Sequence, residues 1–68
     1  SKNNFFITKE TGFKNGPNHT YKSITRFRLG AAVTLLEKTN TYWWKVSYNG
    51  QIGWVKSACV TSVTLLDD

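Results

Sequence analysis

The stretch Tyr42–Val60, YWWKVSYNGQIGWVKSACV, decides the fold of this chain. At its centre, Asn49-Gly50 is a strong hairpin signal, because a type I′ turn needs a positive φ at both central positions. Large apolar side chains alternate with other residues on both sides of this dipeptide, and a period of two puts successive side chains on opposite faces of a strand. The stretch therefore predicts two antiparallel strands. It also holds all three tryptophans of the chain.

Strand alternation divides the aromatic rings of this hairpin between its two faces. Val46 is a clear core position and Trp44 shares its face, so we expect Trp43 to be the outward, exposed ring. Val55 takes the core position next to Trp54, which leaves Trp54 open to ligand contact or to packing. Aromatic side chains are enriched at binding hot spots. Trp43 is therefore a candidate ligand contact, and Trp54 is a second one.

The rest of the chain favours short strands joined by turns. Phe13 is the one large apolar residue of the glycine-rich segment 9–18, and we expect it to pin that segment, as a long loop, to the core. The candidates for burial in the segment 21–29 are Ile24, Phe27 and Leu29. The predicted elements are a strand at 5–8, a loop at 9–18, a bent strand at 21–29, a strand at 32–38, the hairpin, a 3₁₀ turn at 56–58, and a last strand formed by 59–60 and 63–65.

These elements predict an all-β fold, a small antiparallel β-barrel of five to six short strands with one 3₁₀ turn and no α-helix. The 68 residues suffice for a single domain, 1–68, with its core at 6–65. The one cysteine excludes an internal disulfide, and the sequence lacks a Cys and His set of zinc-site size. No apolar run approaches the length of a membrane span. We expect no cofactor, no metal and no membrane partner.

The charge of the chain favours anionic partners. Nine Lys and Arg oppose four acidic residues, and two of those acids are Asp67 and Asp68, so residues 1–66 carry nine basic and two acidic side chains, a formal charge of +7. Such a field attracts nucleic acid, acidic lipid or a polyanionic cell envelope. A lysine-rich surface that serves only solubility is the alternative.

Three motifs resemble the bacterial Src-homology-3 (SH3) domain. They are Val33-Thr34-Leu35-Leu36-Glu37, Trp43-Trp44-Lys45-Val46 and Asn49-Gly50-Gln51-Ile52-Gly53-Trp54-Val55, preceded by Phe13-Lys14-Asn15-Gly16-Pro17 and Tyr21-Lys22. The chain departs from the family pattern at Thr11-Gly12, where Leu-Asn is usual, and at Cys59, where a tyrosine is common. Lys56 stands where the eukaryotic SH3 pattern has a proline, which argues against a proline-rich ligand.

The resemblance implies an SH3-like barrel that anchors a larger enzyme to the bacterial cell wall. Bacterial members are usually appended to peptidoglycan hydrolases and hold them on stem or cross-bridge peptides. We therefore expect a monomeric, non-catalytic targeting module from a larger exported protein, located outside the cell or in the wall, whose partners are peptidoglycan and the appended catalytic domain. The ligand-binding candidates are Trp43, Trp54, Tyr21, Lys14, Asn15, Tyr42 and Tyr48.

Two other functions stay open, and catalysis is not expected. A nucleic-acid-binding small barrel would use the basic residues, but these are scattered singly along the chain. An adaptor for proline-rich peptides, or a module that docks on its own catalytic domain, is the other alternative. Cys59 lies among apolar residues where a thiol is inert, and His19 is expected to be an exposed loop residue.

Overall fold

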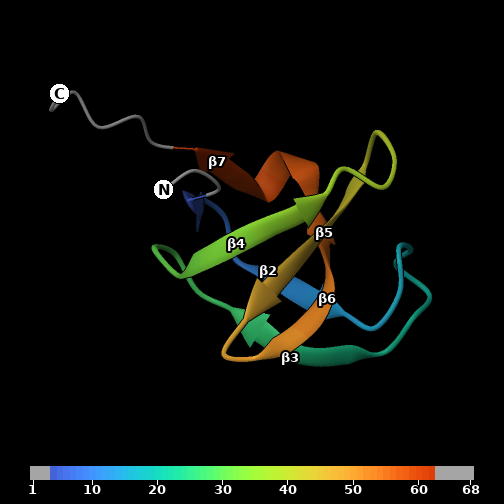
Figure 1. The fold of residues 1–68 in the computed structure, drawn as a ribbon. Coiled ribbons are helices and arrows are strands. Elements are labelled where there is room, and N and C mark those ends of the chain that lie inside the picture. The colour runs from blue at the N-terminus through green and yellow to red at the C-terminus, as the bar shows by residue number, and fades with distance from the viewer. Residues whose placement is uncertain (1–3, 63–68) are drawn as a thin grey trace, which may run out of the picture.

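The computed structural model describes residues 4–62, which form seven short strands and one 3₁₀ turn (Figure 1). Within this range no α-helix occurs, which confirms the all-β class. The elements are β1 (Asn4–Ile7), β2 (Thr11–Lys14), β3 (Ser23–Phe27), β4 (Ala32–Glu37), β5 (Trp43–Tyr48), β6 (Gln51–Lys56), the 3₁₀ turn η1 (Ser57–Cys59) and β7 (Val60–Ser62).

All strand pairs are antiparallel, and the strands form one sheet in the order β3-β2-β6-β5-β4-β1-β7. The sheet curls around the core, with the β5–β6 hairpin in its middle (Figure 1). Among residues 4–62, the end strands β3 and β7 are not paired with each other. Hydrogen bonds therefore do not close the expected barrel. The predicted number of five to six strands is also too low.

The hairpin forms as its sequence predicts. Asn49 and Gly50 have φ values of 52° and 79°, the left-handed values that a type I′ turn requires. Trp44 pairs with Val55 and Val46 pairs with Gly53, so these four residues share the core-facing side. A Cβ at Gly53 would lie 2.6 Å from the Lys14 carbonyl oxygen. The missing side chain therefore lets β2 approach β6 closely.

The strand that the sequence did not predict is β2, which lies within the segment predicted to be a loop. Thr11–Lys14 pairs with β3 on one side and with β6, through Lys14 and Trp54, on the other. Phe13 is fully buried, as expected, but it reaches the core from a strand. The loop prediction was wrong because β2 is stabilised by partners distant in the sequence, whereas its own glycine and polar residues indicate a turn.

The core is aliphatic and aromatic, and it fills the concave side of the sheet. Phe13 and Phe27 pack with ring centroids 4.6 Å apart, and Tyr48 meets Phe27 edge-on at 4.9 Å. Leu29 was expected to be buried, but it is 65% exposed, because it lies in the turn after β3. The last predicted strand segment, 63–65, lies outside the described residues. The buried cluster comprises Ile7, Phe13, Phe27, Val33, Val46, Val55 and Val60.

Candidate functional site

A groove made of two adjoining pockets runs from β2 and β3, past the start of β5, to η1. The two pockets share His19, Trp43 and Lys56, so they form one continuous surface. Trp43 and Lys56 are cross-strand partners at the open end of the hairpin, where the chain enters β5 and leaves β6. His19 comes from the loop between β2 and β3 and forms the opposite wall.

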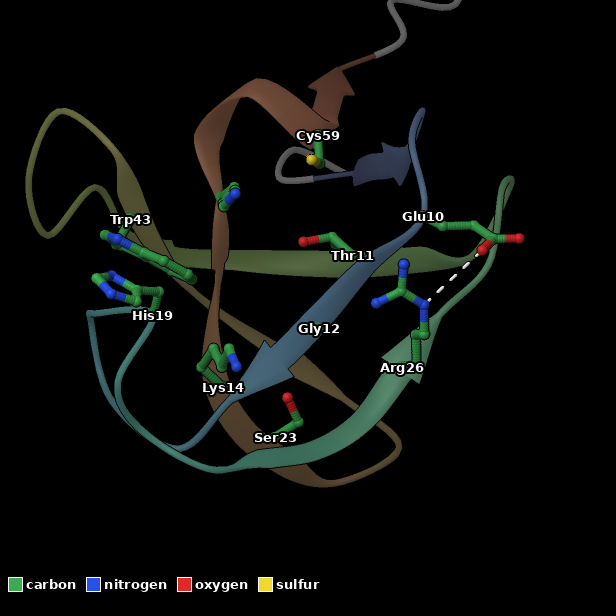
Figure 2. Close-up of a pocket in the computed structure, with 10 residues that line it drawn as sticks. Glu10, Thr11, Gly12, Lys14, His19, Ser23, Arg26, Trp43 and Cys59 are labelled. Carbon is green, nitrogen blue, oxygen red and sulfur yellow. Dashed lines mark ion pairs between the residues drawn. The ribbon is translucent and has the colours of Figure 1, made fainter.

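We call the first of these the polar pocket, and it encloses about 290 Å³. Figure 2 shows its side chains arranged around a common space, with the His19 ring beside the Trp43 ring. An ion pair of 3.8 Å joins Arg26 Nε to Glu10 Oε1 at its rim, where both side chains are largely exposed. The lining residues are Glu10, Thr11, Gly12, Lys14, His19, Ser23, Arg26, Trp43, Lys56 and Cys59.

The second is the aromatic pocket, which encloses about 330 Å³ beside η1. Tyr42 forms its outer wall and, at 72%, is the most exposed large hydrophobic side chain among the described residues. Trp43 forms its inner surface and is only 8% exposed. An accessible tyrosine offers an apolar ring together with a polar hydroxyl. The lining residues are His19, Tyr42, Trp43, Lys56, Ser57 and Ala58.

Hydrogen bonds from a neighbouring loop and from η1 fix the start of β5. The Asn40 side-chain oxygen accepts from the backbone N–H groups of Tyr42 and Trp43, each at 2.9 Å. The Ser57 backbone N–H donates to the Tyr42 carbonyl at 2.9 Å, and the Ser57 hydroxyl donates to the Thr41 carbonyl at 2.8 Å. These bonds hold the two aromatic residues of the groove in register with η1.

The opposite wall is the loop of residues 15–22. The Asn15 N–H donates to the Lys22 carbonyl at 2.9 Å, which closes the base of the loop. At its tip, the Asn18 side-chain oxygen accepts from the Thr20 N–H at 3.1 Å. Gly16 lies under the Tyr21 ring, and a Cβ at Gly16 would come within 2.5 Å of that ring. Tyr21 therefore covers the loop from outside.

Three of the seven predicted ligand-binding residues line the groove. Trp43 lines both pockets, Tyr42 lines the aromatic pocket and Lys14 lines the polar pocket. The division by strand alternation is confirmed, since Trp44 packs against the core and Trp43 lies on the other face. The expected exposure of Trp43 is wrong, because alternation predicts the face of a strand but not what covers it. Here His19 and Lys56 flank the ring.

The other four predicted residues lie outside both pockets. Trp54 donates its indole N–H to the Thr39 hydroxyl at 2.9 Å, and Lys45 Nζ lies 5.7 Å from the ring centroid. Tyr48 shares the core-facing side of β5 and packs against Phe27. Tyr21 and Asn15 are exposed on the loop, where they support its shape. Any ligand contact by these four would lie beyond the groove.

Sequence reasoning missed several groove residues, of which His19 and Lys56 are the most central. His19 is exposed, as expected, but the loop places it across the groove from Lys56. No local pattern marks a loop histidine as a wall residue, because its position depends on how the loop folds against η1. Lys56 could have been found from the sequence, because it stands where the eukaryotic SH3 pattern has a proline.

Within residues 4–62, no group of three His, Cys, Asp or Glu side chains comes together in a way that could hold a metal ion. The helical content of the same part of the chain is the short η1 turn, and no helix there is long and apolar enough to span a membrane.

Comparison with known proteins agrees with this architecture. The family model described as "Bacterial SH3 domain" matches residues 13–61. The chain is also 37% identical over 49 residues to a Bacillus subtilis (strain 168) protein named "Putative N-acetylmuramoyl-L-alanine amidase YrvJ". That match covers 72% of this chain and 9% of the relative, so the chain spans a small part of the relative's length. The match to the family model extends over most of the chain, from β2 to β7, and the chain therefore belongs to the bacterial SH3 domain family.

Proposed function

We propose that this domain is a non-catalytic module that binds peptides of bacterial peptidoglycan and anchors an appended cell-wall hydrolase. The observation that carries the proposal is the groove, in which Trp43 joins an aromatic pocket to a polar one. A peptide needs both kinds of surface, flat rings for its chain and polar groups for its amides and termini. The proposal includes export, since the wall lies outside the cell.

The amidase relative supports the link to the cell wall. The bond named in "N-acetylmuramoyl-L-alanine amidase" joins a wall sugar to the first residue of a wall peptide, and the similar region is 9% of that protein. A small domain of this kind acts by proximity, because tethering raises the local concentration of a catalytic domain at its substrate. The groove itself offers no paired acid and base for hydrolysis, since Glu10 is its one carboxylate among residues 4–62.

The direct test is to sediment the isolated domain with purified sacculi and to measure the fraction bound. We expect Tyr42→Ala to weaken binding about tenfold, because it removes an exposed aromatic wall of the groove. Leu29→Ala is the matched control, since Leu29 is similarly exposed at 65% and lies outside both pockets. Trp43→Ala should abolish binding in a variant shown to remain folded by circular dichroism. Wild-type binding by Tyr42→Ala and Trp43→Ala would exclude the groove.

The same assay separates the alternative functions. A nucleic-acid-binding barrel would bind an oligonucleotide with an affinity that falls steeply with salt, because phosphate contacts release counterions. Binding to sacculi through the aromatic pocket should depend less on salt, since apolar contacts are not screened. Failure to sediment with sacculi, together with tight oligonucleotide binding, would replace the cell-wall proposal with the nucleic-acid one.

A further inference from the structure

We propose that the polar pocket holds a carboxylate of the bound peptide, with the Thr11 hydroxyl as its donor and Lys14 and Lys56 as its counter-charges. This inference rests on the proposed function in one respect, that the ligand of the groove is a peptide. It adds the chemical class of the group that the ligand presents, and it assigns polar residues beside the aromatic ones of the groove.

Thr11 is the first observation that points to a ligand. The residue is 6% exposed, and it is the one buried polar residue in the described part of the chain. Its hydroxyl nevertheless has no hydrogen-bond partner among residues 4–62 and is not enclosed, so its free surface faces the pocket. Figure 2 shows the oxygen directed into the space between Cys59 and Lys14. A hydroxyl that opens on the pocket in this way can donate to a ligand oxygen there.

Gly12 and Lys14 place a positive charge in the same pocket. A Cβ at Gly12 would lie 3.8 Å from Lys14 Nζ and 2.9 Å from Ser23 Oγ. The lysine side chain therefore folds back over the bare backbone of Gly12 and brings its ammonium group into the pocket, beside a serine hydroxyl. Three donors of this kind around one space fit a carboxylate, which accepts hydrogen bonds through both of its oxygens.

The charges around the pocket are unequal. Among residues 4–62, Lys14, Lys56 and Arg26 line it on the basic side, and Glu10 is the one acidic residue of its lining. The contact between Arg26 and Glu10 offsets one positive charge, which leaves the two lysines without an acidic partner in the pocket. Lys56 lines both pockets, so it is placed to attract a carboxylate where the peptide passes from one to the other.

The positions at which this chain departs from the SH3 pattern all meet in this one pocket. Thr11, Gly12, Lys56 and Cys59 are far apart in the sequence, but they line the same space. Cys59 is 7% exposed, and its thiol is much smaller than the tyrosine common at that position. The pocket therefore brings together the positions at which the sequence departs from the bacterial and eukaryotic SH3 patterns.

A peptide carboxylate fits better than a free anion, because the polar pocket continues into the aromatic one. An inorganic ion would use only the donors, whereas a peptide would also cover Trp43 and Tyr42 in the adjoining space. A ligand that gains affinity from both pockets must carry an anionic group next to an uncharged chain.

The test compares two probes by chemical-shift titration of the domain. They are diacetyl-Lys-D-Ala-D-Ala as its free acid and the same peptide as its C-terminal amide, which differ only in the carboxylate. We expect the acid to bind about tenfold more tightly at low salt, because charged hydrogen bonds add to the contacts that both probes share. The advantage should shrink at high salt. Inorganic phosphate, at the same ionic strength, should bind far more weakly than the acid.

Single substitutions test which residues of the pocket bind the carboxylate. Thr11→Val, which keeps the shape of the side chain, and Lys14→Gln should each weaken binding of the acid about fivefold and leave the amide unchanged. Glu10→Gln should strengthen binding of the acid, since it removes the one negative charge of the pocket. Lys22→Gln is the matched control, because Lys22 is exposed and lies outside both pockets.

The outcomes separate this inference from the proposed function. If the domain sediments with sacculi but binds acid and amide equally, or if Thr11→Val sediments like the wild type, the carboxylate site is excluded and the wall-binding module stands. Phosphate binding as tight as that of the acid would also overturn it. A domain that neither sediments with sacculi nor binds either peptide would refute both.

Discussion

Two walls that flank Trp43 in the groove are built in different ways. One wall, formed by the β5–β6 hairpin and η1, rests on a ladder of six residue pairs and on the buried side chains behind it. The other, the loop of residues 15–22, is held by a few hydrogen bonds at its base and tip and by one half-exposed ring, Tyr21. The rigid wall fixes where a ligand lies, and the loop can adjust to it. Changes in the first should cost stability, and changes in the second should cost affinity.

Gly53→Ala should have the largest effect, because it destabilises the packing behind the rigid wall. The new Cβ would lie 2.6 Å from the Lys14 carbonyl oxygen and 2.8 Å from the Phe13 ring, and neither backbone nor fully buried ring can move away. We expect a loss of about 3 kcal/mol in the free energy of unfolding, measured by urea denaturation with circular dichroism. Ile52→Ala, at a neighbouring exposed position, should cost less than about 1 kcal/mol. Equal costs would contradict the close packing of β2 on β6.

Gly16→Ala makes the same change in the loop wall, where a smaller loss of stability is expected. Its Cβ would lie 2.5 Å from the Tyr21 ring, as close as the contact at Gly53, but this ring is 49% exposed and can swing into solvent. We expect a loss of about 1 kcal/mol in the same denaturation experiment, together with weaker binding to sacculi as the loop shifts. A loss as large as that of Gly53→Ala would show that the two walls are equally rigid.

Asn40→Ala and Asn18→Ala compare the hydrogen bonds that support each wall. Asn40 accepts from two backbone N–H groups at the start of β5, whereas Asn18 accepts from the Thr20 N–H and hydroxyl at 3.1 and 3.2 Å. We expect Asn40→Ala to cost about 1 kcal/mol and to speed hydrogen exchange at the Trp43 amide. Asn18→Ala should cost about half as much and leave that amide protected. Faster hydrogen exchange at the Trp43 amide in both variants would show that the two walls are coupled.

Trp54→Phe should have the smallest effect, because Trp54 lies outside the groove. It removes the indole N–H that donates to Thr39 at an exposed site and keeps most of the ring. We expect a change below about 0.5 kcal/mol in the free energy of unfolding and no change in binding to sacculi. Weaker binding with unchanged stability would extend the ligand site beyond the groove, across the outer face of β6.

The hairpin could be predicted from the sequence because its signals are local. Asn49-Gly50 specifies the turn, and alternation then assigns a face to Trp43 and Trp44 without knowledge of the rest of the chain. β2 could not be predicted in this way, because Thr11–Lys14 becomes a strand only through its pairing with β3 and β6. Local glycine signals indicated a loop there.

Prediction of the candidate site from the sequence was limited in the same way, by contacts between distant segments. Tyr42, Trp43 and Lys14 were found through aromatic content and family resemblance, and they do line the groove. His19 and Thr11 were not, because a loop residue and a strand residue carry no sign of which distant segment they will face. Tyr48 was proposed as a ligand contact although alternation puts it on the same face as Val46, and it packs against the core.

The three tryptophans occupy three different electrostatic settings, which has a spectroscopic consequence. Trp43 lies beside His19 in the groove, Trp44 has Lys38 Nζ at 4.7 Å from its ring centroid, and the Trp54 indole N–H is hydrogen-bonded. Steady-state fluorescence would average these rings into one band. Incorporation of 5-fluorotryptophan should instead give three resolved fluorine resonances. One of them would report occupancy of the groove, while the other two would serve as internal references for the folded state.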